Sequence, residues 1–197
     1  MKITAVVASH YQESYVHQLF KSFLKGASGV CSDIVSYDLY ALAFNPVMHG
    51  DDFNQFLGGS LSQEILNYQS RLDETDVLAL FYPVWWNDMP AILKGWVDRV
   101  FSKGFAYQID AQGDRGLLRI QRVILVCTLG NSGESQAQKA LESAMRLKEK
   151  EGVFGYCGIE QVDHVFLHDV YSSAEKRNAY LNDILILGRE LGVQHES

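Results

Sequence analysis

The feature that most constrains the fold is a regular alternation along the chain. Short runs rich in β-branched and apolar residues alternate with segments whose apolar residues have helical spacing. The runs predict strands over 2–8, 34–39, 77–83, 122–128 and 161–167. The intervening segments predict helices over 15–25, 62–72, 90–101, 135–150 and 174–191. Nearly continuous apolar strands are typical of a parallel sheet that is covered on both faces.

This alternation favours an α/β fold with a doubly wound, five-stranded parallel sheet and helices on both faces. At this length the simplest strand order is the flavodoxin-like one, 2-1-3-4-5. No internal repeat or linker-like stretch interrupts the pattern, so residues 1–197 are expected to form a single domain. Right-handed crossovers then place the carboxyl end of every strand on one rim, where such sheets bind ligands.

Composition and charge exclude several classes of function. Hydrophobic residues make up 47% of the chain and charged residues 21%, as in ordinary globular domains. The net charge of -7 argues against a nucleic-acid-binding face, which is normally basic. No apolar run approaches the ~20 residues needed to cross a bilayer, so membrane insertion is not expected. The three cysteines lack metal-like spacing, and a reduced, cytoplasmic protein is expected.

The first predicted rim loop, residues 9–14, places His10 and Ser14 beside the start of a helix. It contains no glycine, and so it is neither a dinucleotide-binding fingerprint nor a P-loop. The unpaired N–H groups and the dipole of a helix amino terminus favour a phosphate group, and nearby hydroxyl or imidazole groups add donors. The alternative is that Ser14 is only a helix cap and His10 a surface residue.

The second rim loop is the most informative part of the sequence. Trp85 and Trp86 lie between Pro83 and Pro90, directly after a predicted strand. A loop rarely exposes so much aromatic surface without a ligand. The prolines stiffen the turn, and we expect the N–H groups of residues 84–87 to face the polar edge of a flat ring such as the isoalloxazine of a flavin. The alternative is that both tryptophans fill gaps in the core.

The third rim loop, residues 128–135, has glycines that allow a close approach of the backbone to a ligand. Gly130 and Gly133 give this freedom, while Thr128 and Asn131 offer polar groups. A tight turn between a strand and a helix would look similar. Its position carries the argument, because the first, third and fourth strands should be neighbours and their loops should line one crevice.

These segments resemble the NAD(P)H:quinone oxidoreductase family, the flavodoxin-like two-electron reductases that include DT-diaphorase. The run "YPVWWNDMPAILKGWVDRVFSKGFAY" resembles the core signature of the family, and "FNPVMHGDDF" resembles the segment that follows its second strand. Together with "SHYQESY", "TLGNSGES" and "GYCGIEQV", the resemblance spans nearly the whole chain. It implies a non-covalent flavin, FAD or alternatively FMN, at the subunit interface of a homodimer.

The resemblance also implies roles for individual residues. Residues that hold the pyrophosphate and ribityl portion match His10, Ser14 and Tyr15. The stretch that wraps the isoalloxazine matches Pro83, Val84, Trp85 and Trp86, and the third flavin loop matches Thr128, Leu129, Gly130 and Asn131. The substrate pocket is expected to involve Trp86, Asn87 and Tyr107. We expect Trp96 to serve core or interface packing, and its helix to lie at or near the dimer interface.

The implied reaction is a ping-pong transfer of hydride from NADH or NADPH to a quinone, azo or nitro acceptor. The flavin carries the chemistry, so no side chain is expected to be catalytic. The first loop lacks the proline of the family and has Val16 where the family has asparagine. Gln136 and Glu142 occupy the positions of a tyrosine and a histidine that DT-diaphorase places near its flavin, and neither role is transferred.

Other functions are weighed against this one. No Ser/His/Asp grouping in the sequence suggests hydrolysis, and the six histidines lack metal-binding spacing. A flavin-bound regulatory subunit of a potassium-efflux system would have a membrane-protein partner. A non-redox flavodoxin-like module would bind a nucleotide or a protein through the same rim.

Overall fold

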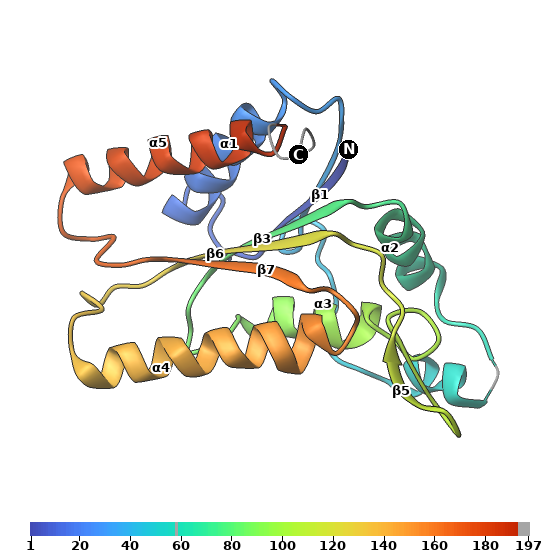
Figure 1. Cartoon of the computed structure of the whole chain (residues 1–197). Coiled ribbons are helices and arrows are strands. Elements are labelled where there is room, and N and C mark those ends of the chain that lie inside the picture. Colours follow the sequence, from blue (N-terminus) through green and yellow to red (C-terminus); the bar gives the residue numbers. More distant parts are fainter. Residues whose placement is uncertain (58, 193–197) are drawn as a thin grey trace.

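The computed structural model describes residues 1–57 and 59–192, and its centre is a five-stranded parallel sheet (Figure 1). The strand order is β2-β1-β3-β6-β7, which is the predicted order 2-1-3-4-5 once a small separate hairpin is set aside. The strands are β1 (Lys2–Val7), β2 (Asp33–Asp38), β3 (Val77–Pro83), β6 (Arg122–Thr128) and β7 (Gln161–Leu167). The flavodoxin-like fold expected from the sequence is therefore confirmed.

Helices cover both faces of the sheet. They are α1 (Tyr15–Ala27), α2 (Gln63–Asp73), α3 (Ala91–Val100), α4 (Gln136–Leu147) and α5 (Ala174–Glu190). One core cluster joins α1 and α5 to the sheet, and a second cluster on the other face joins α2 and α3 to it (Figure 1). The sheet interior is dry, because the side chains of β3 from Val77 to Tyr82 are all buried.

Local sequence sets the start of most helices. Serine residues at the N-cap positions of α1, α2, α4 and α5 accept a hydrogen bond from a backbone N–H in the first turn, as this residue type favours. The helix α3 instead follows Pro90, whose missing N–H costs nothing at a helix start. These boundaries place the amino ends of α1, α3 and α4 beside the carboxyl ends of the strands that precede them.

Three features differ from the sequence expectations. The hairpin of β4 (Tyr107–Asp110) and β5 (Gly113–Gly116) was not anticipated, nor was the 3-10 helix η1 (Gly50–Leu57). The predicted helix over 135–150 ends at Leu147 and continues as the π-helix η2 (Lys148–Gly155). In α4 only Met145 is buried, so its apolar residues Ala137, Ala140, Leu141, Ala144 and Leu147 lie exposed on the chain.

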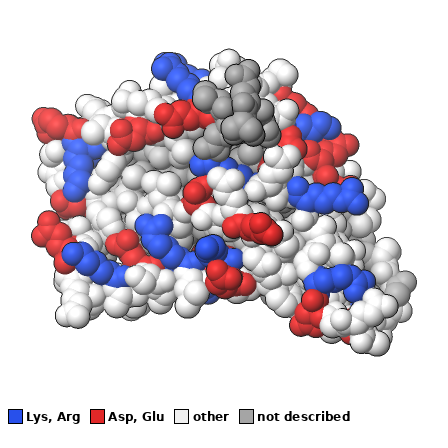
Figure 2. All heavy atoms as spheres, in the orientation of Figure 1, with Lys and Arg blue, Asp and Glu red and all other residues white. Residues whose placement is uncertain are grey.

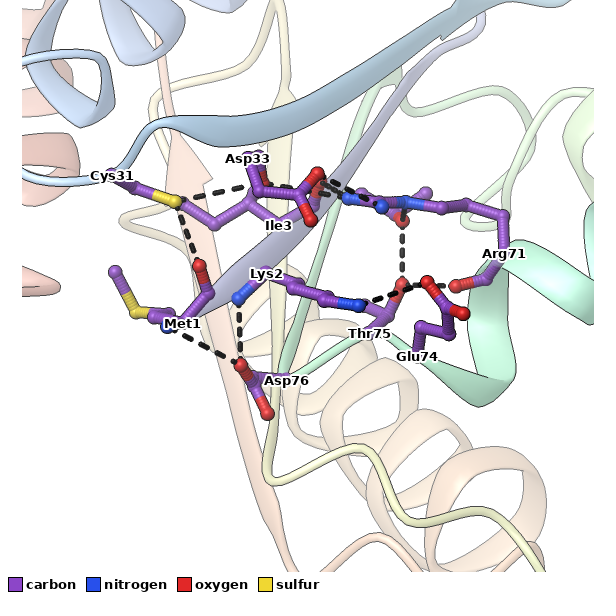
Figure 3. A network of polar contacts seen from close by, with 10 residues as sticks. Met1, Lys2, Ile3, Cys31, Asp33, Arg71, Glu74, Thr75 and Asp76 are labelled. Carbon is purple, nitrogen blue, oxygen red and sulfur yellow. Dashed lines mark hydrogen bonds and ion pairs between the residues drawn. The ribbon is translucent and has the colours of Figure 1, made fainter.

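A polar network holds together the amino ends of the central strands, at the edge opposite the rim (Figure 3). Arg71 of α2 is its centre: the guanidinium donates to the Ile3 carbonyl at 3.0 Å and lies 2.9 Å from the Asp33 carboxylate. The hydroxyls of Thr4 and Thr75 are buried and 2.6 Å apart. Arg71 therefore ties α2 to both β1 and β2, and its loss would leave the Ile3 carbonyl without this donor.

We predict that Arg71→Ala lowers the free energy of unfolding by about 2–3 kcal/mol, the range for a hydrogen-bonded charged group that is mostly buried. Urea unfolding followed by circular dichroism measures this. Lys2→Gln is the matched control, because the Lys2–Glu74 pair of the same network is exposed and should contribute little. Equal decreases in the free energy of unfolding of the two variants would contradict a central role for Arg71.

Candidate functional site

Four loops at the carboxyl ends of the strands enclose a cavity of about 310 Å³. Its lining residues are Ser9, His10, Tyr11, Ser14, Tyr15, Val16, Pro83, Trp85, Thr128, Val170 and Tyr171. The three loops singled out in the sequence therefore converge, as expected from neighbouring strands β1, β3 and β6. This rim lies at the left of Figure 1, where β7 leads into α5 and α4 begins.

In the first loop, the predicted residues His10, Ser14 and Tyr15 all line the cavity. Ser14 is the N-cap of α1, and its Oγ accepts from the His17 N–H at 3.3 Å. The first-turn N–H groups of Tyr15 and Val16 have no intrahelical acceptor, because this holds for the start of any α-helix. Ser14 is thus both the cap of α1 and part of the cavity wall, so the two roles considered for it in the sequence are compatible.

Behind Ser14 lies a polar chain that sequence reasoning missed. The His17 imidazole is buried and lies 3.0 Å from Ser14 Oγ and 3.0 Å from the Asp38 carboxylate. This is a Ser/His/Asp grouping, which the sequence analysis did not find. The available signal was that His17 lies one turn after Ser14, and Asp38 at the carboxyl end of the neighbouring strand β2.

The second loop forms a tight turn from Trp85 to Asp88. Each of these two residues donates its N–H to the carbonyl of the other at 3.0 Å. The residues between them, Trp86 and Asn87, have φ angles of 52° and 60°. Two left-handed residues are the mark of a type I′ turn, and a bulky residue in this region costs about 1–3 kcal/mol. Lys148 of η2 binds the Asp88 carboxylate and anchors the turn.

This geometry corrects part of the expectation for the second loop. The N–H of Val84 donates to the Thr128 carbonyl and that of Trp85 to Asp88, so neither is free to face a ligand. Trp86 is 98% exposed and Trp85 40% exposed, which excludes core filling as the role of Trp86. The Trp85 ring lies 5.7 Å from the His10 ring, and together they give the cavity an aromatic wall.

The third loop contributes mainly backbone. Thr128 lines the cavity, and Leu129 is buried with its N–H bonded to the Leu167 carbonyl. At Gly130 a Cβ atom would lie 3.2 Å from the Tyr171 ring, so this glycine lets the ring close over the loop. Asn131 lies in a narrow crevice beside the cavity, where Asn87 and Glu142 are also found.

A fourth loop, after β7, was not anticipated as part of the site. Val170 and Tyr171 line the cavity, and Tyr171 is 83% exposed. In the same loop, His168 lies 3.1 Å from the Asn131 side-chain oxygen and 2.6 Å from the Glu142 carboxylate. The position of this loop, directly after a parallel strand, was the signal that could have found it.

Tyr107 lies apart from the other predicted site residues. It lines a separate groove of about 370 Å³ with residues of α3 and η2, and its ring is 5.4 Å from that of Tyr156. The hairpin that begins with Tyr107 is at the lower right of Figure 1, far from the rim at the left. Within one chain, Tyr107 and the pair Trp86–Asn87 therefore do not form a common pocket.

The site is weakly charged. None of the cavity-lining residues is lysine or arginine, and on the face drawn in Figure 2 basic and acidic side chains are interspersed. Among the described residues, no group of three or more His, Cys, Asp or Glu side chains could hold a metal ion. In the same part of the chain, no helix is both long and apolar enough to span a bilayer.

Comparison with known proteins identifies the family. A family model described as flavodoxin-like fold matches residues 1–185. An uncharacterized NAD(P)H oxidoreductase of Escherichia coli is 33% identical over 162 residues, which cover 80% of each protein. The chain belongs to the NAD(P)H:quinone oxidoreductase family. As a member of this family, it is an oxidoreductase, and the resemblance found in the sequence is confirmed.

Two further matches support this assignment. The rat protein NAD(P)H dehydrogenase [quinone] 1 is 27% identical over 158 residues, and the match covers 70% of this chain and 58% of the rat protein. The solved NAD(P)H:quinone oxidoreductase of Methanothermobacter marburgensis superposes with a TM-score of 0.88 at 25% identity. That superposition covers 100% of this chain and 99% of the archaeal one. The chain thus spans just over half the length of the rat relative.

Proposed function

We propose that this chain is a single-domain, flavin-dependent NAD(P)H:quinone oxidoreductase that passes hydride to quinones or similar acceptors by a ping-pong mechanism. The observation that carries the proposal is the convergence of three matched loops on one aromatic-walled cavity. An apolar cleft with a few convergent polar groups is the usual form of a cofactor site. The enzyme is expected to be cytoplasmic, since its three cysteines are free and buried.

The residues around the cavity fit a flavin. Trp85 offers a partly exposed ring face, and the N–H groups of Trp86 and Asn87 take no part in the hydrogen bonds that close their turn. At the other end, the start of α1 presents the N–H groups and hydroxyls that suit a phosphate. The cavity thus combines a flat apolar surface with two sets of donors, as an isoalloxazine ring with a phosphorylated chain requires.

The proposed roles follow from this arrangement. His10, Ser14 and Tyr15 hold the phosphate and ribityl portion, and the loops of Pro83–Trp86 and Thr128–Asn131 enclose the ring. A bound flavin would supply the hydride chemistry, while the protein provides orientation and excludes water. Trp86 and Asn87, at the exposed tip of their turn, bound the space where the substrates enter. FAD and FMN both carry the ring, ribityl chain and phosphate that these residues would hold, and NADH or NADPH is the proposed donor.

We predict that the purified protein has the absorption spectrum of a flavoprotein, and that Trp85→Ala weakens flavin binding by about 1–3 kcal/mol, the cost of losing an aromatic contact at a ligand site. Titration of the flavin-free protein with FMN and FAD, followed by fluorescence, measures this. Phe53→Ala is the control, because Phe53 is a half-exposed aromatic residue on η1. A wild-type protein that binds neither flavin would refute the proposed function.

We further propose that the enzyme is a homodimer in which a second copy completes the substrate pocket. The expected interface helix, α3, uses nearly all its apolar residues within the chain: Trp96 is fully buried, and the exposed Lys94 and Asp98 pair with each other at 2.5 Å. The apolar face of α4 is instead unpartnered, with Leu141 43% and Leu147 64% exposed. This face adjoins the Asn87 crevice, and only a second copy could bring Tyr107 to such a site.

We predict that Leu147→Glu shifts the flavin-bound protein from dimer to monomer in sedimentation velocity, because it places a charge in an apolar contact. Leu57→Glu, at an 88% exposed position on η1, should leave the dimer intact. A wild-type monomer at micromolar concentration would contradict the dimer, and a dimer insensitive to Leu147→Glu would place its interface elsewhere.

Steady-state kinetics test the reaction itself. NADH or NADPH oxidation with a soluble quinone should give parallel lines in double-reciprocal plots, because the donor leaves before the acceptor enters the same pocket. Tyr107→Ala should change the preference among quinone, azo and nitro acceptors more than it changes the flavin content. A flavin-loaded protein that is inactive with both donors and all three acceptor classes would exclude the enzyme and favour the regulatory-subunit alternative.

A further inference from the structure

The proposed flavin brings a negatively charged phosphate into a cavity with no lysine or arginine in its lining. The whole chain carries a net charge of -7, so the surrounding field does not favour an anion either. Near the start of α1, positive charge can come from the helix dipole and, when protonated, from the imidazole groups of His10 and His17. Arg177 lies behind the lining, where its guanidinium donates to the Val170 carbonyl at 3.4 Å. His10 is exposed, whereas His17 is buried behind the wall of the cavity.

His17 is linked to the cavity by a continuous chain of hydrogen bonds. The Ser9 hydroxyl donates to Ser14 Oγ at 2.9 Å, and Ser14 Oγ lies 3.0 Å from His17 Nδ1. His17 Nε2 lies 3.0 Å from Asp38 Oδ2. The other oxygen of Asp38 accepts the N–H groups of Tyr40 and Ala41, both at 3.1 Å. Both serines line the cavity, so the chain runs from the cavity wall to a fixed carboxylate.

A count of the protons shows that this row of hydrogen bonds has two arrangements, one with neutral and one with protonated His17. The Asp38 carboxylate only accepts, so His17 Nε2 carries a proton in both states. In the neutral imidazole Nδ1 accepts, and it takes the Ser14 O–H. The two lone pairs of Ser14 Oγ then accept from the Ser9 hydroxyl and the His17 N–H. Neither serine hydroxyl is left to donate into the cavity.

Protonation of His17 reverses this arrangement. Nδ1 becomes a donor and needs a lone pair of Ser14 Oγ, which already accepts two hydrogen bonds. The Ser9 hydroxyl is therefore displaced, and the Ser14 O–H no longer has an acceptor behind it. Both hydroxyls then turn toward the cavity, where a phosphate oxygen would accept them. One proton taken up at Nδ1 thus reverses the Ser14–His17 hydrogen bond, breaks the Ser9–Ser14 hydrogen bond and frees two hydroxyl donors for the ligand.

We infer that His17 is a proton-linked positioning residue: its protonation releases the Ser9 and Ser14 hydroxyls to bind the phosphate of the flavin. This rests on the proposed function. Because the bound phosphate favours protonated His17, flavin affinity gains from protonation of the imidazole and loses that gain when the imidazole is neutral. Over the described residues, Asp38 is the one ionisable side chain that contacts the imidazole. No other ionisable group in contact with His17 therefore competes with the bound phosphate for the effect on its protonation.

The test is the dissociation constant of FMN and FAD for wild type and His17→Gln, from about pH 5 to 8, where histidine titrates. Glutamine can fill the site but cannot take up the proton. The ratio of the variant constant to the wild-type constant should be about tenfold at the acid end and approach one at the alkaline end. FAD is the primary ligand for this comparison, because its pyrophosphate stays fully ionised over this range, whereas the FMN phosphate has a pKa of about 6.

Riboflavin provides the decisive control, because it has the same ring and ribityl chain but no phosphate. Its ratio should be independent of pH. A ratio for FMN and FAD that is constant with pH, or one that riboflavin reproduces, would assign His17 a structural role and overturn the inference. Wild-type protein that binds none of the three ligands would instead refute the proposed function.

Two histidine variants separate His17 from its neighbours. His10→Gln should weaken binding without removing the pH dependence. His49→Gln, at an exposed side chain directly before η1, should change neither. Loss of the pH dependence in His10→Gln alone would transfer the role to His10.

Calorimetry of the wild type in buffers of different ionisation enthalpy gives a test that needs no variant: FAD binding should take up protons near neutral pH, and riboflavin binding should not.

Discussion

The parallel pairing of β1, β3 and β6 is the constraint on which the site depends. Val7 pairs with Phe81, and Pro83 pairs with Thr128, so the chain leaves all three strands at nearly the same level. The pairing continues past the sheet, where the Val84 N–H donates to the Thr128 carbonyl. Because one apolar core fixes this register, residues more than a hundred positions apart lie around one cavity without any direct bond between their side chains.

The turn from Trp85 to Asp88 is a strained segment that the end of the sheet holds in place. Two left-handed residues, one of them a tryptophan, are costly in an isolated chain. Here the turn is held by its own pair of hydrogen bonds, by Val84 on one side and by the Lys148–Asp88 contact on the other. The surrounding structure therefore offsets this cost, and the N–H groups of Trp86 and Asn87 take no part in the hydrogen bonds that close the turn. Strain of this kind is more often found at functional sites than elsewhere.

Much of this arrangement could be predicted from the sequence, and the limits have physical reasons. Strand positions follow from the continuous apolar runs that a covered parallel sheet requires, and the sheet order from the simplest doubly wound topology at this length. His17 and Asp38 were missed because a hydrogen-bonded pair between two elements leaves no periodic signal, and each residue looks ordinary alone. The exposure of the apolar face of α4 could not be predicted, because amphipathic spacing predicts an apolar face but not what covers it. The N–H groups of Val84 and Trp85 were misjudged because turn type depends on φ angles that this sequence does not favour.

The charge of the site connects the fold to its chemistry. A chain with a surplus of carboxylates can hold an anion only where donors are fixed before the ligand arrives, since mobile basic side chains are not present in the cavity lining. Backbone N–H groups at the start of α1 meet this need, and they are positioned by β1 and by the burial of α1 against α5. Such donors are neutral, so they do not attract competing anions from a distance. Under the proposed function, selectivity for a phosphorylated, flat ligand would come from requiring the aromatic wall and the helix start to be occupied together.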